Sequence, residues 1–275
     1  MGADRGSRAG AHVSGPAGRR FADRNVIVTG GARGIGEEVA RQLAAEGAHV
    51  QVLDVAAQAL HAWCGELDPD TAGRIRAHVA DIRDASAIGE LVAVLDDERP
   101  VDGLVNAAGV LTTGAFLSTD AQSWRHMLDV NAYGTLVVTQ AVAARMVARR
   151  RGAIVTVASN AGATPRSGLT AYCASKAAAT MLTRCAGLEL ARYGIRCNVV
   201  SPGSTDTPML SEVAGAGPER EARSIAGDPS VFRAGIPLGK IAVPRDIAQS
   251  VAFLLSDDAG HITMRELVVD GGATF

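Results

Sequence analysis

Lysine and aromatic residues are scarce in this chain of 275 residues. Only two lysines occur, Lys176 and Lys240, and aromatic side chains make up 4% of the sequence. The net charge is -2 and nearly every basic residue is arginine, which we attribute to composition and not to a binding patch. A chain with neither a basic stripe nor a DNA-binding motif is not expected to bind nucleic acid.

Long apolar runs and paired cysteines are also missing. No run of about 18 apolar residues is present to span a bilayer. The four cysteines form no C-x-x-C pair and no histidine cluster accompanies them, which favours free thiols in a reducing compartment over a metal site. Residues 1–20 lack the apolar segment of a secretory signal. We therefore expect a cytoplasmic protein without a metal, whose residues 1–20 form a disordered tail.

Short β-branched runs alternate with helical patterns through the rest of the chain. The expected strands are 25–30, 48–54, 75–81, 101–109, 152–159, 195–203 and 266–272. The expected helices are 36–47, 85–98, 121–149, 170–192 and 244–255. Such alternation indicates βαβ units, in which a parallel sheet is covered by helices on both faces. We predict a single α/β domain over residues 21–275, with a seven-stranded, doubly wound parallel sheet of the Rossmann type.

One segment, residues 204–240, interrupts this alternation. It is long, and Gly, Ala and Pro are scattered through it among charged residues. Connections of this length are usually functional or disordered, and ligands of open α/β sheets bind beyond the carboxyl ends of the strands. Because this segment leaves such a strand end, we interpret it as a substrate lid.

A glycine-rich turn joins the first strand to the first helix. In "VTGGARGIG", the glycines Gly30, Gly34 and Gly36 follow the pattern G-x-x-x-G-x-G. Glycine permits a tight turn and close backbone approach, while a helix N-terminus offers free N–H groups to a pyrophosphate. The turn therefore predicts a dinucleotide site.

Asp54 ends the second expected strand and bears on the choice of dinucleotide. A carboxylate at this position accepts hydrogen bonds from ribose hydroxyls and repels a 2'-phosphate. Arg33 could instead pair with such a phosphate, but Val55 occupies a place where a basic residue would favour phosphate binding. We therefore predict NAD. Asp81 after the third strand is expected to meet the adenine, and the small residues of 106–109 to lie against the adenosine.

Tyr172 and Lys176 are spaced four residues apart on an expected helix, so their side chains share one face. Ser159 ends the preceding strand, at the same edge of the sheet. These residue types suit hydride transfer at a carbinol carbon, because a base must take the hydroxyl proton as the hydride leaves. Free tyrosine has a pKa near ~10, and a neighbouring ammonium and an oxidised nicotinamide would both favour its phenolate. Ser159 would hold the substrate oxygen, and Asn131 would link Lys176 to a water chain.

Taken in order, "TGGARGIG", "NAAG", Asn131, Ser159, "YCASK" and "SPGSTDTPM" resemble the short-chain dehydrogenase/reductase family over about residues 24–272. The resemblance implies a sheet order of 3-2-1-4-5-6-7, a catalytic tetrad of Asn131, Ser159, Tyr172 and Lys176, and a homotetramer. It also implies that Thr205 binds the nicotinamide carboxamide.

The full set of expected ligand contacts follows from the same pattern. The expected NAD contacts are Gly30, Arg33, Gly34, Ile35, Gly36, Asp54, Asp81, Ile82, Asn106, Ala107, Ala108, Gly109, Tyr172, Lys176, Pro202, Gly203 and Thr205. The expected substrate contacts are Ser159, Arg166, Tyr172 and Met209.

A branch of that family resembles the chain more closely, in stretches from both halves. These stretches are "GAIVTVASNAGATPR", "GLELARYGIRCNVVSPGSTDTPM", "GIPLGKIAVPRDIA" and "HITMRELVVDGG". The branch oxidises a dihydroxylated cyclohexadiene carboxylate to 2,3-dihydroxybenzoate with NAD, in pathways to catechol siderophores. The resemblance implies that Tyr172 takes the C3 hydroxyl proton, that hydride leaves C3, and that the resulting ketone tautomerises to the aromatic product.

Arg166 is the candidate partner of the substrate carboxylate, because a guanidinium matches a carboxylate with two hydrogen bonds. It is one of many arginines, so a plain surface position is the alternative. Three other functions also stay open: a dehydrogenase of trans-2,3-dihydro-3-hydroxyanthranilate, a general alcohol dehydrogenase or ketoreductase, and a catalytically silent NAD-binding regulator. The complete tetrad argues against the last.

Overall fold

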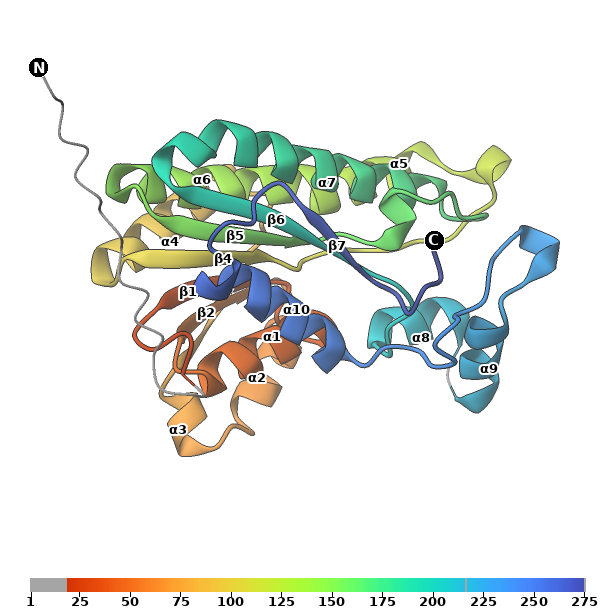
Figure 1. Ribbon diagram of the computed structural model, residues 1–275, viewed down its shortest axis with the longest axis horizontal. Helices are drawn as coiled ribbons and strands as arrows, with labels where there is room; N and C mark the ends of the chain where they lie inside the picture. The colour runs from red at the N-terminus through yellow and green to blue at the C-terminus, as the bar shows by residue number, and fades with distance from the viewer. Residues whose placement is uncertain (1–18, 216, 275) are drawn as a thin grey trace, which may run out of the picture.

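The computed structural model describes residues 19–215 and 217–274, so the predicted tail at 1–20 lies almost entirely outside the described residues. Within them, seven parallel strands form one sheet in the order β3-β2-β1-β4-β5-β6-β7 (Figure 1). The strands are β1 Asn25–Thr29, β2 His49–Asp54, β3 Ile75–Val79, β4 Val101–Asn106, β5 Gly152–Val157, β6 Ile195–Pro202 and β7 Glu266–Val269. The predicted doubly wound sheet and its order are confirmed.

Helices cover both faces of this sheet. On one face lie α1 Gly34–Ala45, α2 Ala57–Cys64 and α10 Pro244–Leu255, and on the other lie α4 Ala85–Glu98, α6 Thr135–Arg149 and α7 Thr170–Leu190 (Figure 1). Alternate side chains of β1 pack into the apolar layers on the two faces of the sheet. Val26 and Val28 pack on the first face and Ile27 packs on the second. A strand buried on both faces explains why "NVIVT" is a nearly continuous apolar run.

The predicted helix 121–149 is helical throughout but is not a regular α-helix. It consists of α5 Ala121–Leu128, a π-helical turn Asp129–Gly134, and α6. The π-turn holds Asn131, which is buried, and its Thr135 neighbour donates a 2.9 Å hydrogen bond to the Asn131 carbonyl oxygen. π-Turns inside helices are frequent at functional sites.

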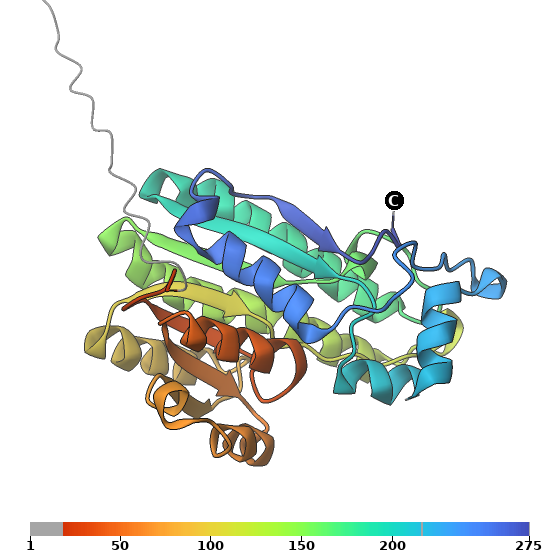
Figure 2. The same cartoon turned by 60° about the horizontal axis from the view of Figure 1, so that its bottom comes forward.

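Helices also form where the sequence predicted none. Between β2 and β3 lie α2 and the short α3 Pro69–Ala72. The segment expected to be a lid contains α8 Pro208–Ala214 and α9 Pro218–Ala226. Figure 2 shows both lid helices beyond the end of the sheet, on the side where β6 ends. The segment expected to be a lid is therefore a folded part of the domain, and the word lid below refers to residues 204–240.

Most predicted strands overshoot at their carboxyl ends. β4 ends at Asn106 and β5 at Val157, so 107–109 and 158–159 lie in the loops that follow. These loop residues lie at the edge of the sheet formed by the carboxyl ends of the parallel strands. Ligands of open α/β sheets bind at this edge.

Candidate active site

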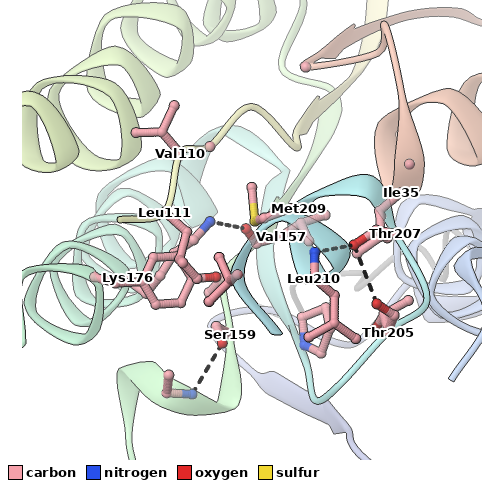
Figure 3. A pocket seen from close by; sticks show the side chains of 18 of the residues that line it. Ile35, Val110, Leu111, Val157, Ser159, Lys176, Thr205, Thr207, Met209 and Leu210 are labelled. Carbon is pink, nitrogen blue, oxygen red and sulfur yellow. Dashed lines mark hydrogen bonds between the residues drawn. The ribbon is translucent and has the colours of Figure 1, made fainter. Parts of the chain in front are cut away.

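A cavity of about 670 Å³ lies at the carboxyl edge of the sheet. Its walls come from the β1–α1 turn, the loops after β2 to β6, the start of α7 and the lid. Figure 3 shows Lys176 and Ser159 on one side of this cavity and the lid residues Met209 and Leu210 on another. Almost all residues that the sequence assigned to cofactor and substrate meet in this one cavity.

Close backbone packing explains the glycines of the β1–α1 turn. Gly30 has φ +69°, and a Cβ added to it would lie 2.4 Å from Ala108 Cα in the loop after β4. A Cβ on Gly36 would lie 2.2 Å from the Gly30 carbonyl oxygen. No L-residue with a side chain fits either place, so the turn can only take this tight shape with glycine.

Asp54 is fixed by the turn beside it. Its carboxylate accepts a 2.9 Å hydrogen bond from the Ala32 N–H on one oxygen and another from the Ala56 N–H on the other. A carboxylate offers about four acceptor positions, so each oxygen keeps capacity for a ligand hydroxyl. Arg33 instead pairs with Glu212 of α8 at 2.5 Å, which ties the glycine-rich turn to the lid.

Asp81 lines the cavity beside β3 and is paired with Arg83. The Arg83 side chain forms an ion pair with it at 2.6 Å, and these hydrogen bonds hold the pKa of Asp81 below its usual value. Ile82 packs against the π-turn: a Cβ on Gly134 would lie 2.5 Å from its Cδ1. The cavity edge and the π-turn are therefore in direct contact.

Tyr172 lies in the first turn of α7 and is 8% exposed. Burial raises the pKa of its phenol to about 12, while hydrogen bonding with the Ser159 side chain acts in the opposite direction. The Ser159 hydroxyl also accepts a 3.2 Å hydrogen bond from the Ala161 N–H, which fixes its orientation (Figure 3). The two polar groups predicted to face a carbinol are thus neighbours.

Lys176 follows on the same face of α7 and is 5% exposed. Its ammonium lies 5.8 Å from the centroid of the Tyr172 ring and donates a 3.1 Å hydrogen bond to the Val157 carbonyl oxygen (Figure 3). Burial lowers the pKa of Lys176 to about 8. Burial thus raises the pKa of Tyr172 and lowers the pKa of Lys176. Both shifts oppose the pair of phenolate and ammonium that the sequence predicts.

Asn131 is placed by the π-turn near Lys176 without a direct hydrogen bond between the two side chains in the described structure. Its amide nitrogen donates to the Val110 carbonyl oxygen and to the Ser175 hydroxyl, both at 2.9 Å, and its Oδ1 accepts from the Val110 N–H at 2.8 Å. A Cβ on Gly109 would lie 3.2 Å from Lys176 Nζ and 3.3 Å from Asn131 Oδ1. The small residue in "NAAG" therefore lets these two side chains approach.

One predicted cofactor contact, Asn106, and one predicted catalytic residue, Asn131, stand apart from the cavity wall. Neither Asn131 nor Asn106 lines the cavity. The Asn106 side chain is buried behind the wall, where it donates to the Thr139 hydroxyl at 3.0 Å and to the Thr156 hydroxyl at 3.4 Å. Asn106 ends β4, and strand residues alternate in direction, so its side chain points into the layer under α6.

Arg166 and Met209, which are predicted to bind the substrate, and Thr205, which is predicted to bind the nicotinamide, all line the cavity. Thr205 is 5% exposed and donates to the Gly203 carbonyl oxygen at 3.2 Å. Several further lining residues escaped the sequence reasoning: Val110, Leu111, Leu169, Thr207, Leu210, Arg233 and Ile236. Their sequence signal is weak, because apolar residues and arginines are common throughout the chain.

Comparison with known proteins agrees with this architecture. The chain belongs to the short-chain dehydrogenase family, whose model, described as "short chain dehydrogenase", matches residues 24–216. It is accordingly an oxidoreductase, and the family works with a nicotinamide cofactor. The predicted family membership is confirmed.

Individual relatives are more specific. The chain is 47% identical to the 2,3-dihydro-2,3-dihydroxybenzoate dehydrogenase of Bacillus subtilis (strain 168), covering 90% of this chain and 95% of that protein. It is 44% identical to the vibriobactin-specific 2,3-dihydro-2,3-dihydroxybenzoate dehydrogenase of Vibrio cholerae, with the same coverage. Among solved structures, levodione reductase has a TM-score of 0.83 at 30% identity, covering 92% of this chain and 98% of that one. In the described residues, no helix has the length and apolar character needed to cross a membrane.

Proposed function

We propose that the protein oxidises 2,3-dihydro-2,3-dihydroxybenzoate to 2,3-dihydroxybenzoate with NAD, as a step toward catechol siderophores. The observation that carries this proposal is the set of relatives bearing that activity in their names, at 42–47% identity over at least 90% of the chain. The site supports it, because one cavity offers a buried phenol for a carbinol and arginines for a carboxylate.

The residues of the site divide the reaction between them. Ser159 positions the C3 hydroxyl, and Tyr172, as the phenolate, takes its proton as the C–H bond at C3 breaks. NAD, held by the glycine-rich turn and Asp54, would supply the hydride acceptor, and loss of the hydride would leave a carbonyl at C3. Loss of the C2 proton to water as the carbonyl becomes a hydroxyl gives the aromatic catechol, so aromaticity favours oxidation. The protein supplies mainly position and charge.

The glycine-rich turn and Asp54 fit a dinucleotide. The backbone at Gly30 and Gly36 leaves no space for side chains, which favours close approach of a pyrophosphate to the N-terminus of α1. We infer NAD over NADP from two contacts. Asp54 places a negative charge where a 2'-phosphate would lie, and Arg33 is engaged by Glu212.

This choice predicts the effect of removing the Asp54 charge. The wild-type protein should turn over faster with NAD than with NADP, and Asp54→Asn should lower the NAD/NADP ratio of kcat/KM at least about tenfold, as repulsion of the phosphate is lost. Steady-state kinetics with both cofactors measure the ratio. Asp97→Asn, on the exposed face of α4, is the control. Faster turnover of the wild type with NADP would contradict the assignment.

A second prediction concerns Lys176 and pH. The Lys176 side chain favours the Tyr172 phenolate only while it is a protonated ammonium. Because the pKa of Lys176 is about 8, this electrostatic stabilisation is present below pH 8 and is lost as the pH rises through 8. Lys176→Met should therefore move the acid limb of the pH–rate profile up by about 1–3 pH units, the usual range for the effect of a neighbouring opposite charge. The profile of kcat/KM at saturating NAD measures it. Lys240→Met, which changes the only other lysine, should leave the limb in place; an unmoved limb in Lys176→Met would remove Lys176 from this role.

The environment and assembly of the protein are further proposals. The family resemblance favours a homotetramer, and the four free cysteines of the described chain favour the cytoplasm. The lid over 204–240 would close over the substrate, since its residues Thr207, Met209 and Arg233 line the cavity.

One assay tests the reaction itself. The protein and NAD are mixed separately with 2,3-dihydro-2,3-dihydroxybenzoate, with trans-2,3-dihydro-3-hydroxyanthranilate and with a simple secondary alcohol, and NADH absorbance is followed. We expect the highest kcat/KM with the first acid. A higher kcat/KM with the dihydro-hydroxyanthranilate would mean that the natural substrate carries an amine at C2 instead of a hydroxyl. A higher kcat/KM with the simple alcohol would refute the proposed function.

A further inference from the structure

The lid contributes a second guanidinium to the cavity that holds Arg166. Arg233 follows the 3-10 turn Pro229–Val231 and lines the same cavity. Its backbone exchanges two 2.9 Å hydrogen bonds with Asp228, which closes a short hairpin in the lid. Its side chain donates a 2.8 Å hydrogen bond to the Ser204 hydroxyl in the loop after β6. Both ends of Arg233 are therefore anchored.

The charges of Arg233 and Arg166 act on each other. Burial lowers the pKa of the Arg233 guanidinium, the positive charge of Arg166 lowers it further, and the Asp228 carboxylate raises it. That carboxylate is itself held by Ser230, which donates its backbone N–H at 3.0 Å and its hydroxyl at 2.6 Å. Two like charges in a partly buried wall repel each other, and an anion bound between them would relieve the repulsion.

The negative charges of the cavity lie at its other end. Of the described lining residues, the carboxylates are Asp54 and Asp81, at the ends of β2 and β3, and Asp81 is paired with Arg83. Within the described part of the chain, neither Arg166 nor Arg233 forms an ion pair. The cavity is thus polarised, with two guanidinium groups on the substrate side that form no ion pair with any described residue.

We propose that Arg233 is a specificity-determining residue that binds the substrate carboxylate together with Arg166. This inference rests on the proposed function and deepens it. Each guanidinium presents planar N–H donors that match the two oxygens of a carboxylate. One arginine comes from the loop that precedes the Tyr172 helix and the other from the lid. The bound carboxylate would therefore join the lid to the catalytic wall and fix the ring relative to Tyr172.

The first experiment compares an acid with its neutral analogue. Binding of 2,3-dihydroxybenzoate and of 2,3-dihydroxybenzamide to the full-length protein with NADH is measured by fluorescence or calorimetry. We expect the wild type to prefer the acid, and Arg233→Met to lose at least about tenfold of that preference, since a hydrogen bond to a charged group is lost. Arg233→Lys, which keeps the charge but not the fork, should retain part of it.

The control must remove an arginine without touching the cavity. Arg245, which is exposed at the start of α10 and does not line the cavity, is replaced by methionine. Arg245→Met should bind acid and amide as the wild type does. Arg166→Met should resemble Arg233→Met, and the double variant should lose less than the product of the two single losses if both groups bind one carboxylate. An Arg233→Met protein whose acid preference equals that of Arg245→Met would overturn the proposal.

Turnover separates this proposal from the proposed function. If Arg233 binds the carboxylate, Arg233→Met raises the KM for the dihydro acid at least about tenfold and leaves the KM for NAD unchanged. A wild type that binds benzoates selectively but does not oxidise the dihydro acid would refute the function and leave the carboxylate site standing. If the wild type oxidises the dihydro acid and Arg233→Met has an unchanged KM for it, the proposed function would stand and the role of Arg233 would be refuted.

Discussion

Tyr172→Phe should reduce turnover of the dihydro acid by about 10²–10⁴-fold, the contribution of a positioned proton-transfer group. The phenol of Tyr172 is buried beside Ser159, and the centroid of its ring lies 5.8 Å from the Lys176 ammonium. Phenylalanine fills the same space but cannot accept the C3 hydroxyl proton. NAD binding should remain nearly intact, because the glycine-rich turn and Asp54 are not altered.

The measurement combines single-turnover kinetics with cofactor binding. Removing the hydroxyl should also cost about 1 kcal/mol of the free energy of unfolding, the usual value of one hydrogen bond. Tyr193→Phe is the matched control, since Tyr193 lies beyond α7 and contacts Arg150 and Arg192 outside the cavity. Substantial activity remaining in Tyr172→Phe would exclude Tyr172 as the base.

Gly30→Ala is expected to have the second large effect, on both cofactor binding and stability. The new Cβ would lie 2.4 Å from Ala108 Cα and 2.5 Å from the Ala108 nitrogen, and neither backbone atom can move like a side-chain tip. The φ of +69° adds strain of about 1–2 kcal/mol for a residue with a Cβ. A displacement of about 1 Å at the turn should lower kcat/KM about 10²-fold.

A second glycine gives this prediction its control. Gly89 lies in α4 with nothing within 4 Å of an added Cβ, so Gly89→Ala should raise the free energy of unfolding by about 0.5–1 kcal/mol and leave kinetics unchanged. Denaturant unfolding and NADH titration on both variants supply the comparison. If Gly30→Ala bound NADH as tightly as Gly89→Ala, the turn would not be the cofactor cradle.

The sequence predicts the sheet well because its strands are buried on both faces and are therefore apolar throughout. It also predicts that Tyr172 and Lys176 are neighbours, since four residues on a helix bring two side chains to one face. It does not predict the π-turn at Asp129–Gly134, because apolar periodicity continues through that turn and reads as one helix. Lid helix α8 has an N-terminal signal in Thr207 and Pro208, but the glycines and charges around it mask the pattern.

Arg233 shows a different limit of sequence reasoning. Its role depends on a hairpin in the lid that brings it to the same cavity as Arg166, 67 positions earlier in the chain. Arginines are numerous in this chain, so residue type alone does not distinguish it. Only the packing of the lid against the loop after β6 separates this arginine from those on the surface.

The π-turn also determines which changes of chain length this segment tolerates. A π-turn contains one residue more than the α-helical turn it replaces. Because the turn absorbs this extra residue, loss of one residue from Asp129–Gly134 would let α5 and α6 merge into a regular α-helix whose two halves keep their present orientation. The cost would fall on Asn131, whose contacts with Val110 and Ser175 are made from within the turn. A one-residue deletion here should therefore preserve the packing of α6 against the sheet and disturb the active site.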